Sequence, residues 1–172
     1  PNGILCNHMM TKWRTTAKAA RSPGAIWSSI FFLMLLSPVA QAATCRFTVQ
    51  PVDFGLYNPG AAASLDVTGS VDVRCTGNAG SFVLTISQSS SGGFAPRRMV
   101  SGPYLLEYNL YADPARQLIW GDGTGGTVVN SGEKTSSGRP VSFSFPIYGR
   151  IFPRQSVGEG LYTDTLLVTS IY

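Results

Sequence analysis

Cysteine and histidine can act as nucleophiles, bases or metal ligands, and their positions in this chain limit which of these sites it can form. The single histidine, His8, and one of the three cysteines, Cys6, lie within the first eight residues. Only Cys45 and Cys75 remain for the rest of the chain. A histidine-based triad or an imidazole metal site therefore requires the extreme N-terminus. Neither later cysteine has a candidate base beside it, which disfavours a reactive thiol.

Carboxylates are the second source of possible chemistry. Glu107 is followed along the chain by two further acids, Asp113 and Asp122. Secreted glycosidases use a pair of carboxylates for catalysis. A chain with nine acids offers such pairs by chance, and no compact acidic motif accompanies them. A carboxylate hydrolase stays open as an alternative, but we expect no catalytic residues and no enzyme activity.

Two motifs could hold anions. The stretch Gly121–Gly126 satisfies G-x-G-x-x-G, but a dinucleotide site needs a helix to begin there. The β-branched residues of Thr127–Val129 follow instead, so we predict a glycine-rich loop. The pair Arg97-Arg98 is interpreted as solvated loop charges, with an anion site as the alternative. We expect no cofactor and no metal.

The N-terminal stretch 12–42 has the pattern of a secretory signal. Ala25–Leu36 forms a twelve-residue apolar core, and Ala40-Gln41-Ala42 is a small-residue cleavage pattern. Twelve residues reach about 18 Å as a helix, against ~30 Å of membrane hydrocarbon, so an anchor is disfavoured. We predict a leader within residues 1–42, translation from Met9 or Met10, and one domain over residues 43–172.

Export of the chain changes how the remaining residues are interpreted. An even pair of cysteines in an oxidising compartment is most simply a disulfide, here Cys45–Cys75. The predicted leader accounts for the whole net charge of +4, because it contains four basic residues and no acidic one. From position 43 onward the chain has nine basic and nine acidic residues. A neutral domain gives no reason to expect nucleic acid as a partner.

Composition and alternation predict an all-β fold. Gly (19) and Pro (11) are too frequent for a helix-rich chain. Apolar residues alternate with polar ones in short runs separated by turns, which is typical of a single antiparallel immunoglobulin-like sandwich. These runs are Cys45–Val49, Val71–Cys75, Phe82–Ile86, Leu106–Leu110, Val141–Phe145 and Tyr162–Tyr172. In Gly160-Leu161-Tyr162, the tyrosine fits two interpretations equally well: a tyrosine corner, or an ordinary tyrosine within a strand.

Six blocks of the chain resemble the spore coat protein U domain family, in the family's order. They are Val52–Tyr57, Gly69–Cys75, Leu106–Tyr111, Trp120–Gly123, Tyr148–Ile151 and Gly160–Thr165. Together they extend over most of Cys45–Tyr172. The family includes subunits of archaic chaperone–usher pili.

The resemblance implies an incomplete sandwich that lacks its last strand. A periplasmic chaperone, and then a neighbouring pilin subunit at an outer-membrane usher, would supply that strand, and the product would be a surface fibre or coat. We expect a strand that finishes at Tyr172 to be the last one, with no further strand after it to complete the sheet. The rival interpretation is a self-contained secreted module that binds carbohydrate through loop aromatics.

The predicted cleavage site suggests a place in such a fibre. Cleavage after Ala42 leaves two residues before Cys45, too few to donate a strand of about ten residues. We therefore expect a tip or capping subunit, with the loops Gly121–Gly126 or Ser87–Gly93 available for adhesion or biofilm formation.

Overall fold

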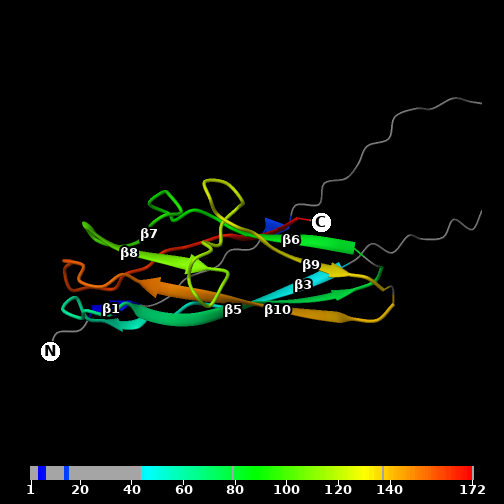
Figure 1. Ribbon diagram of the computed structural model, residues 1–172, viewed down its shortest axis with the longest axis horizontal. Helices are drawn as coiled ribbons and strands as arrows, with labels where there is room; N and C mark the ends of the chain where they lie inside the picture. The colour runs from blue at the N-terminus through cyan, green and yellow to red at the C-terminus, as the bar shows by residue number, and fades with distance from the viewer. Residues whose placement is uncertain (1–3, 7–13, 16–43, 79, 137, 172) are drawn as a thin grey trace, which may run out of the picture.

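The structure is a computed structural model that describes residues 4–6, 14–15, 44–78, 80–136 and 138–171. The described residues form strands and loops without a helix, which confirms the all-β prediction. Two antiparallel-dominated sheets pack face to face (Figure 1). Nowhere among these residues does a helix have the length and apolarity needed to cross a membrane.

The first sheet has five strands in the order β3-β5-β10-β8-β7. The long central strands β5 and β10 pair along their whole length, from Val141 opposite Cys75 to Ile151 opposite Leu65. The strand bounds are β3 Thr44–Gln50, β5 Leu65–Thr76, β7 Arg97–Ser101, β8 Tyr104–Tyr111 and β10 Val141–Ile151.

The second sheet has the order β2-β11-β6-β9. Its strands are β2 Arg14–Thr15, β6 Gly80–Ile86, β9 Asn130–Lys134 and β11 Val168–Ile171. Two short strands, β1 Ile4–Cys6 and β4 Gly55–Tyr57, pair with each other as a separate two-stranded ribbon. The strand predicted over Tyr162–Tyr172 is shorter than expected: regular pairing is confined to β11, and Tyr172 lies outside the described residues.

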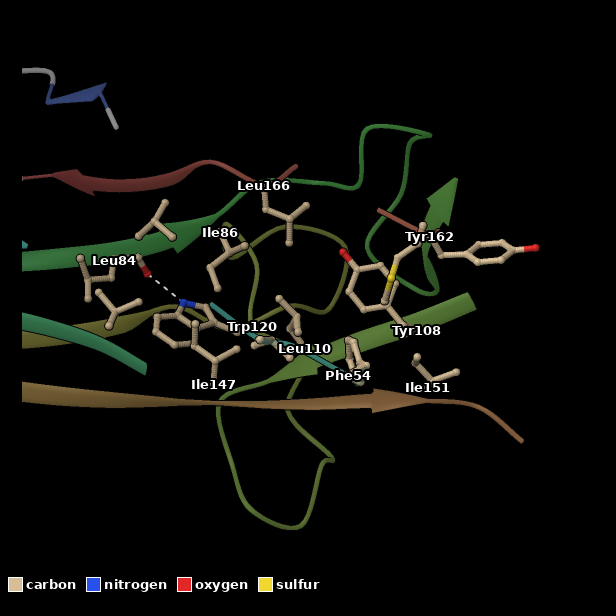
Figure 2. Close-up of a cluster of buried hydrophobic side chains, with 14 of the residues drawn as sticks. Phe54, Leu84, Ile86, Tyr108, Leu110, Trp120, Ile147, Ile151, Tyr162 and Leu166 are labelled. Carbon is tan, nitrogen blue, oxygen red and sulfur yellow. Dashed lines mark hydrogen bonds between the residues drawn. The ribbon is translucent and has the colours of Figure 1, made fainter. Parts of the chain in front are cut away.

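The core lies between the two sheets because each strand turns its apolar residues inward. Phe82, Leu84 and Ile86 of β6 are at most 2% exposed, and Val71, Val73 and Cys75 of β5 at most 1%. Trp120 fills the centre, where its indole Nε1 donates to the carbonyl of Leu84 at 3.2 Å (Figure 2). Period-two alternation therefore placed the core correctly.

An ion-pair cluster fastens the outer face of the first sheet at the end of β10. The guanidinium of Arg150 donates two hydrogen bonds to the carboxylate of Asp66, of 2.7 and 2.8 Å. The guanidinium of Arg116 lies 3.3 Å from the same carboxylate. The hydrogen bond from Arg150 lowers the pKa of Asp66, with the charge of Arg116 adding to the effect. The carboxylate is one-third exposed, so we expect the cluster to contribute only about 1 kcal/mol.

Acid unfolding tests this cluster. Because the folded-state pKa is lowered, the contribution of Asp66 is present above the unfolded-state pKa of ~3.9 and is lost as pH falls through the folded-state value. We expect Asp66→Asn to lower stability by about 1 kcal/mol at pH 7 and to converge with the wild type at the acid end. Urea unfolding from neutral to low pH measures this. A constant difference across the whole range would contradict it.

Candidate strand-acceptor groove

On one side of the sandwich the first sheet ends in β3, and the second sheet has only the two residues of β2 beyond β11. β9 lies against β10, and Phe82 of β6 contacts Phe47 of β3 with ring centroids 6.4 Å apart. The sequence β9-β6-β11 in the second sheet therefore runs across the first sheet from β10 toward β3. We infer from this order that β3 and β11 lie on the same side of the sandwich, facing each other across the core.

The inner face on this side of the sandwich is only partly covered. Phe47 and Val49 on β3, like Phe143 and Phe145 on β10, point toward the core but remain half-buried. Phe82 reaches across from β6 to Phe143 and Phe145, at 5.2 and 6.0 Å between ring centroids. Core residues on β6, by contrast, are almost fully buried. We call this half-covered apolar strip along β3, with the neighbouring edge of β11, the acceptor groove.

The edge of β11 already carries an added strand in the structure. The two residues of β2 pair with it in parallel, Arg14 opposite Thr169 and Thr15 opposite Ser170. Both belong to the stretch 12–42 that the sequence predicts to be the leader. This edge of the second sheet therefore has backbone groups in position to bond a further strand.

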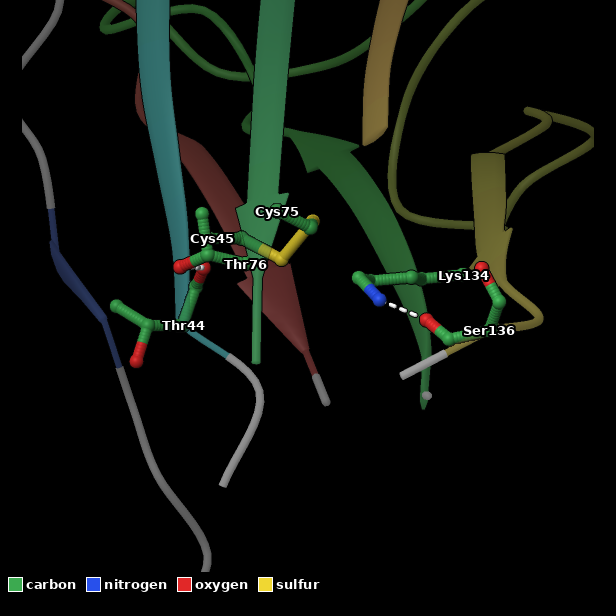
Figure 3. Close-up of a disulfide and its surroundings, with 6 residues drawn as sticks. All are labelled: Thr44, Cys45, Cys75, Thr76, Lys134 and Ser136. Carbon is green, nitrogen blue, oxygen red and sulfur yellow. Dashed lines mark hydrogen bonds between the residues drawn. A yellow bond between two sulfur atoms is a disulfide. The ribbon is translucent and has the colours of Figure 1, made fainter. Parts of the chain in front are cut away.

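A disulfide fastens β3, the strand that borders the groove. Cys45 and Cys75 are directly opposite in the register of β3 and β5, and their sulfur atoms are bonded (Figure 3). Cys75 is 1% exposed, with its side chain on the inner face beside Val73. Among the described strands β3 pairs with β5 alone, so the bond secures an edge strand.

Tyrosine hydroxyls fasten the long crossing between β10 and β11. The Tyr162 hydroxyl donates to the carbonyl of Gly158 at 2.7 Å, and its ring is fully buried. This geometry suits a tyrosine corner, and that assignment of Tyr162 stays a prediction. Tyr57 also donates to the carbonyl of Phe152, and Tyr108 to the carboxylate of Asp164. Their roles were missed because a sequence gives no sign of which loop passes over a strand tyrosine.

The interpretation of Arg97 as a solvated loop charge is wrong. It lies on β7 and is fully buried, and its guanidinium donates to Asn109 Oδ1 and to the carbonyls of Ser87 and Trp120. Burial lowers the pKa of Arg97, whereas the nearby Tyr108 and Asp164 act in the opposite direction. Arg97 joins β7, β8 and two loops, so its role is to hold the sandwich together.

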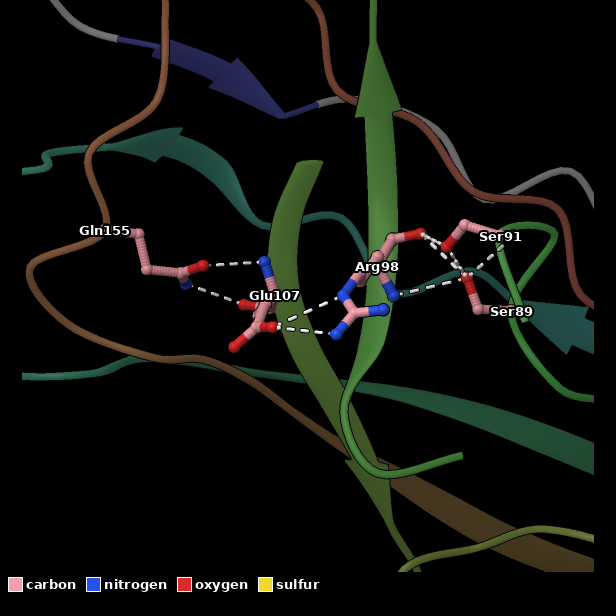
Figure 4. Close-up of polar contacts among 5 residues, drawn as sticks. All are labelled: Ser89, Ser91, Arg98, Glu107 and Gln155. Carbon is pink, nitrogen blue, oxygen red and sulfur yellow. Dashed lines mark hydrogen bonds and ion pairs between the residues drawn. The ribbon is translucent and has the colours of Figure 1, made fainter. Parts of the chain in front are cut away.

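Arg98, next in the chain, points the other way and is paired at the surface. Its guanidinium lies 3.2 Å from Glu107, with both side chains roughly 40% exposed (Figure 4). Gln155 holds the backbone of Glu107 from the other side. Neither arginine is therefore left as an open anion site.

The carboxylates considered for hydrolysis have structural bonds in the structure. Asp113 accepts from the backbone amides of Gln117 and Leu118, and Asp122 from Thr124. These hydrogen bonds lower the pKa of both acids. A general acid needs a raised pKa, so the arrangement does not favour acid catalysis.

The glycine-rich stretch is a loop that β9 follows, as predicted. Gly123, Gly125 and Gly126 have positive φ, and a side chain on Gly121 would collide with Thr127. Trp120 and Val128 form an isolated bridge across its ends. Glycine is required by this turn geometry and not by a phosphate. Among the described residues, no group of three or more His, Cys, Asp or Glu side chains could hold a metal ion.

These observations define a class: an immunoglobulin-like sandwich with a half-covered apolar strip beside an edge strand that bonds a further strand. The spore coat protein U domain model matches residues 30–169, so the chain belongs to the spore coat protein U domain family. Protein U of Myxococcus xanthus is 31% identical over 131 residues, covering 69% of each chain.

A solved structure supports the fold. The pre-assembly complex of the chaperone CsuC with the tip adhesion subunit CsuE, from the archaic chaperone–usher Csu pili of Acinetobacter baumannii, contains a chain that superposes with a TM-score of 0.54 at 20% identity. The match covers 76% of this chain and 40% of the other, so this chain spans less than half the length of that relative.

Proposed function

We propose that this protein is an exported structural subunit of a chaperone–usher type fibre or surface coat, completed by a strand from another protein. The half-covered inner face of β3, next to a β11 edge that pairs with an added strand, carries the proposal. An added strand gains main-chain bonds from β11, and its alternate side chains cover Phe47 and Val49. Catalysis has no part in this function.

The partners follow from this chemistry. A periplasmic chaperone lends a strand after the leader is removed, and a neighbouring subunit replaces it at the outer-membrane usher. The CsuC–CsuE complex is a chaperone–subunit pair of this kind, and its likeness in fold supports the proposal. The mature protein then resides at the cell surface.

Chaperone capture tests the groove with a matched pair of variants on one strand. Val49 faces the groove, whereas its neighbour Gln50 faces solvent on the same strand. Val49→Asp places an unpaired charge against the incoming apolar strand and is expected to reduce co-purification with the co-expressed cognate chaperone at least tenfold. Gln50→Asp, with the same added charge, should leave capture unchanged. Equal capture of both variants would favour a self-contained binding module.

The position in the fibre is a further part of the proposal. With cleavage after Ala42, two residues precede Cys45, so the mature chain accepts a strand without donating one. In a fibre that grows from its base, such a subunit occupies the distal tip, where the loops Ser87–Gly93 and Gly121–Gly126 are available for adhesion and biofilm formation.

Two measurements check the tip position. Amino-terminal sequencing of the mature protein is expected to begin at Ala43, and immunogold labelling is expected at fibre ends. Label along the whole shaft, or a mature start well before Ala43, would overturn the tip role without affecting the acceptor groove.

A further inference from the structure

Two arginines lie directly opposite each other on the outer face of the first sheet, at its disulfide end. The strand register pairs Arg46 of β3 with Arg74 of β5, and Arg74 in turn with Ser142 of β10. Both arginines are exposed. Like charges directly opposite each other destabilise an antiparallel pair. The protein therefore keeps an unfavourable pair at this position.

Within the described part of the chain, no carboxylate forms an ion pair with either of these arginines. The ion pairs there involve Arg98, Arg116 and Arg150, whereas neither Arg46 nor Arg74 takes part in one. The nearest acid in the register, Asp72, accepts a hydrogen bond from Ser70 at 3.2 Å. The strands thus hold the backbones of two arginines directly opposite each other, on the same face of the sheet.

The arginines line a hollow that also contains hydroxyl groups. It has a volume of about 420 Å³, within the ~300–1,000 Å³ of sites that hold small ligands. Its polar lining comes from adjacent rows of the three strands: Arg46, Thr48, Asp72, Arg74, Ser142 and Ser144. Fork-shaped guanidinium donors suit a carboxylate, and the hydroxyls with Asp72 suit neutral donors and acceptors.

We propose that this hollow binds an acidic polysaccharide, with a sugar carboxylate held between Arg46 and Arg74. Sugar hydroxyls then bond Asp72 and the hydroxyls of Thr48, Ser142 and Ser144. Asp72 favours a polysaccharide over a nucleic acid as the ligand. Its carboxylate repels a densely charged chain such as a nucleic acid, whereas it accepts hydrogen bonds from the hydroxyls of a sugar ring. The site faces outward from the sheet, opposite to the acceptor groove, and so goes beyond the proposed function.

Binding to polygalacturonate tests this site, with neutral dextran and duplex DNA as comparison polymers. The exported, chaperone-bound protein is expected to bind polygalacturonate in a salt-dependent way and to leave dextran unbound. The double variant Arg46→Gln with Arg74→Gln should bind at least tenfold more weakly. The matched control Arg154→Gln removes one exposed arginine elsewhere and should stay within twofold of the wild type.

Two further measurements separate a sugar site from a merely charged or structural surface. Asp72→Asn should weaken binding to polygalacturonate, whereas simple attraction of polyanions predicts tighter binding. The double arginine variant should melt at the same or a higher temperature, because repulsion is relieved. A lower melting temperature, an equal loss in Arg154→Gln, no binding by the wild type at low salt, or preference for DNA would overturn the proposal.

Discussion

Cys75→Ser is expected to lower the free energy of unfolding by about 3–4 kcal/mol. The disulfide spans 30 residues, and closing a loop of that length restricts the unfolded chain by this amount in the chain-entropy model. A loss of this size is a large part of the ~5–15 kcal/mol that stabilises an ordinary domain. Since the bond holds β3, which borders the acceptor groove, the variant should also accumulate poorly in the periplasm.

Denaturant unfolding of the chaperone-free protein measures the loss, and mass spectrometry establishes the starting state. The wild type should gain two hydrogens on reduction, as expected for one disulfide. The double variant Cys45→Ser with Cys75→Ser should lose no more than the single variant, whereas Thr76→Ser at the next, exposed position should change little. Free thiols in periplasmic wild-type protein, or a loss below about 1 kcal/mol, would contradict the role given to the bond.

Arg97→Gln is expected to be destabilising by about 3–5 kcal/mol, although its neighbour is nearly neutral. The change removes the bonds from the guanidinium to Asn109, to the buried carbonyl of Trp120 and to the partly buried carbonyl of Ser87, and unpaired buried acceptors are costly. Arg98→Gln removes the same charge from the solvent-exposed pair with Glu107 and should cost less than about 1 kcal/mol. Urea unfolding of the two variants compares them directly. Equal losses would show that Arg97 does not hold the sandwich together.

The fold was predictable because alternation is a local property of the chain. Val71–Cys75 and Phe82–Ile86 turn every second residue inward, and the structure buries those residues. The glycine loop was predictable for a similar reason, since Thr127–Val129 favours extended backbone over a helix. Local sequence was sufficient wherever neighbours along the chain decide the conformation.

The tertiary contacts were not predictable in this way. Arg97 is buried because Ser87, Asn109 and Trp120 converge on it from separate elements, and no short window of sequence contains them. The short strands β4, β7 and β9 were missed because their residues, such as the pair Arg97-Arg98, lack clean alternation. Regular pairing begins only at Val168 because the preceding residues cross from one sheet to the other. The backbone of Thr163 still bonds Val100 of β7, in the first sheet, and the carbonyl of Leu167 accepts from Ser87, just after β6 in the second sheet.

The acceptor groove was predictable only in part from the sequence. The alternation of Cys45, Phe47 and Val49 predicts an inner face but cannot show that the face is only half-covered. Coverage depends on how far the second sheet extends, which is a property of the assembled sandwich. The resemblance to the spore coat protein U domain suggested the groove, and the half-buried side chains supply physical support for it.

The most direct test of strand acceptance is thermal unfolding of the chaperone-free protein with a donor peptide. The peptide is taken from the N-terminal extension of a co-encoded subunit, and a control peptide has one groove-facing apolar residue replaced by arginine. Strand acceptance predicts a melting temperature that rises with peptide concentration, because the peptide binds only the folded state, and slower amide exchange in β11. The control peptide should have little effect. A stable monomer with no shift at saturating donor peptide would show that the sandwich is already complete and would contradict the proposed function.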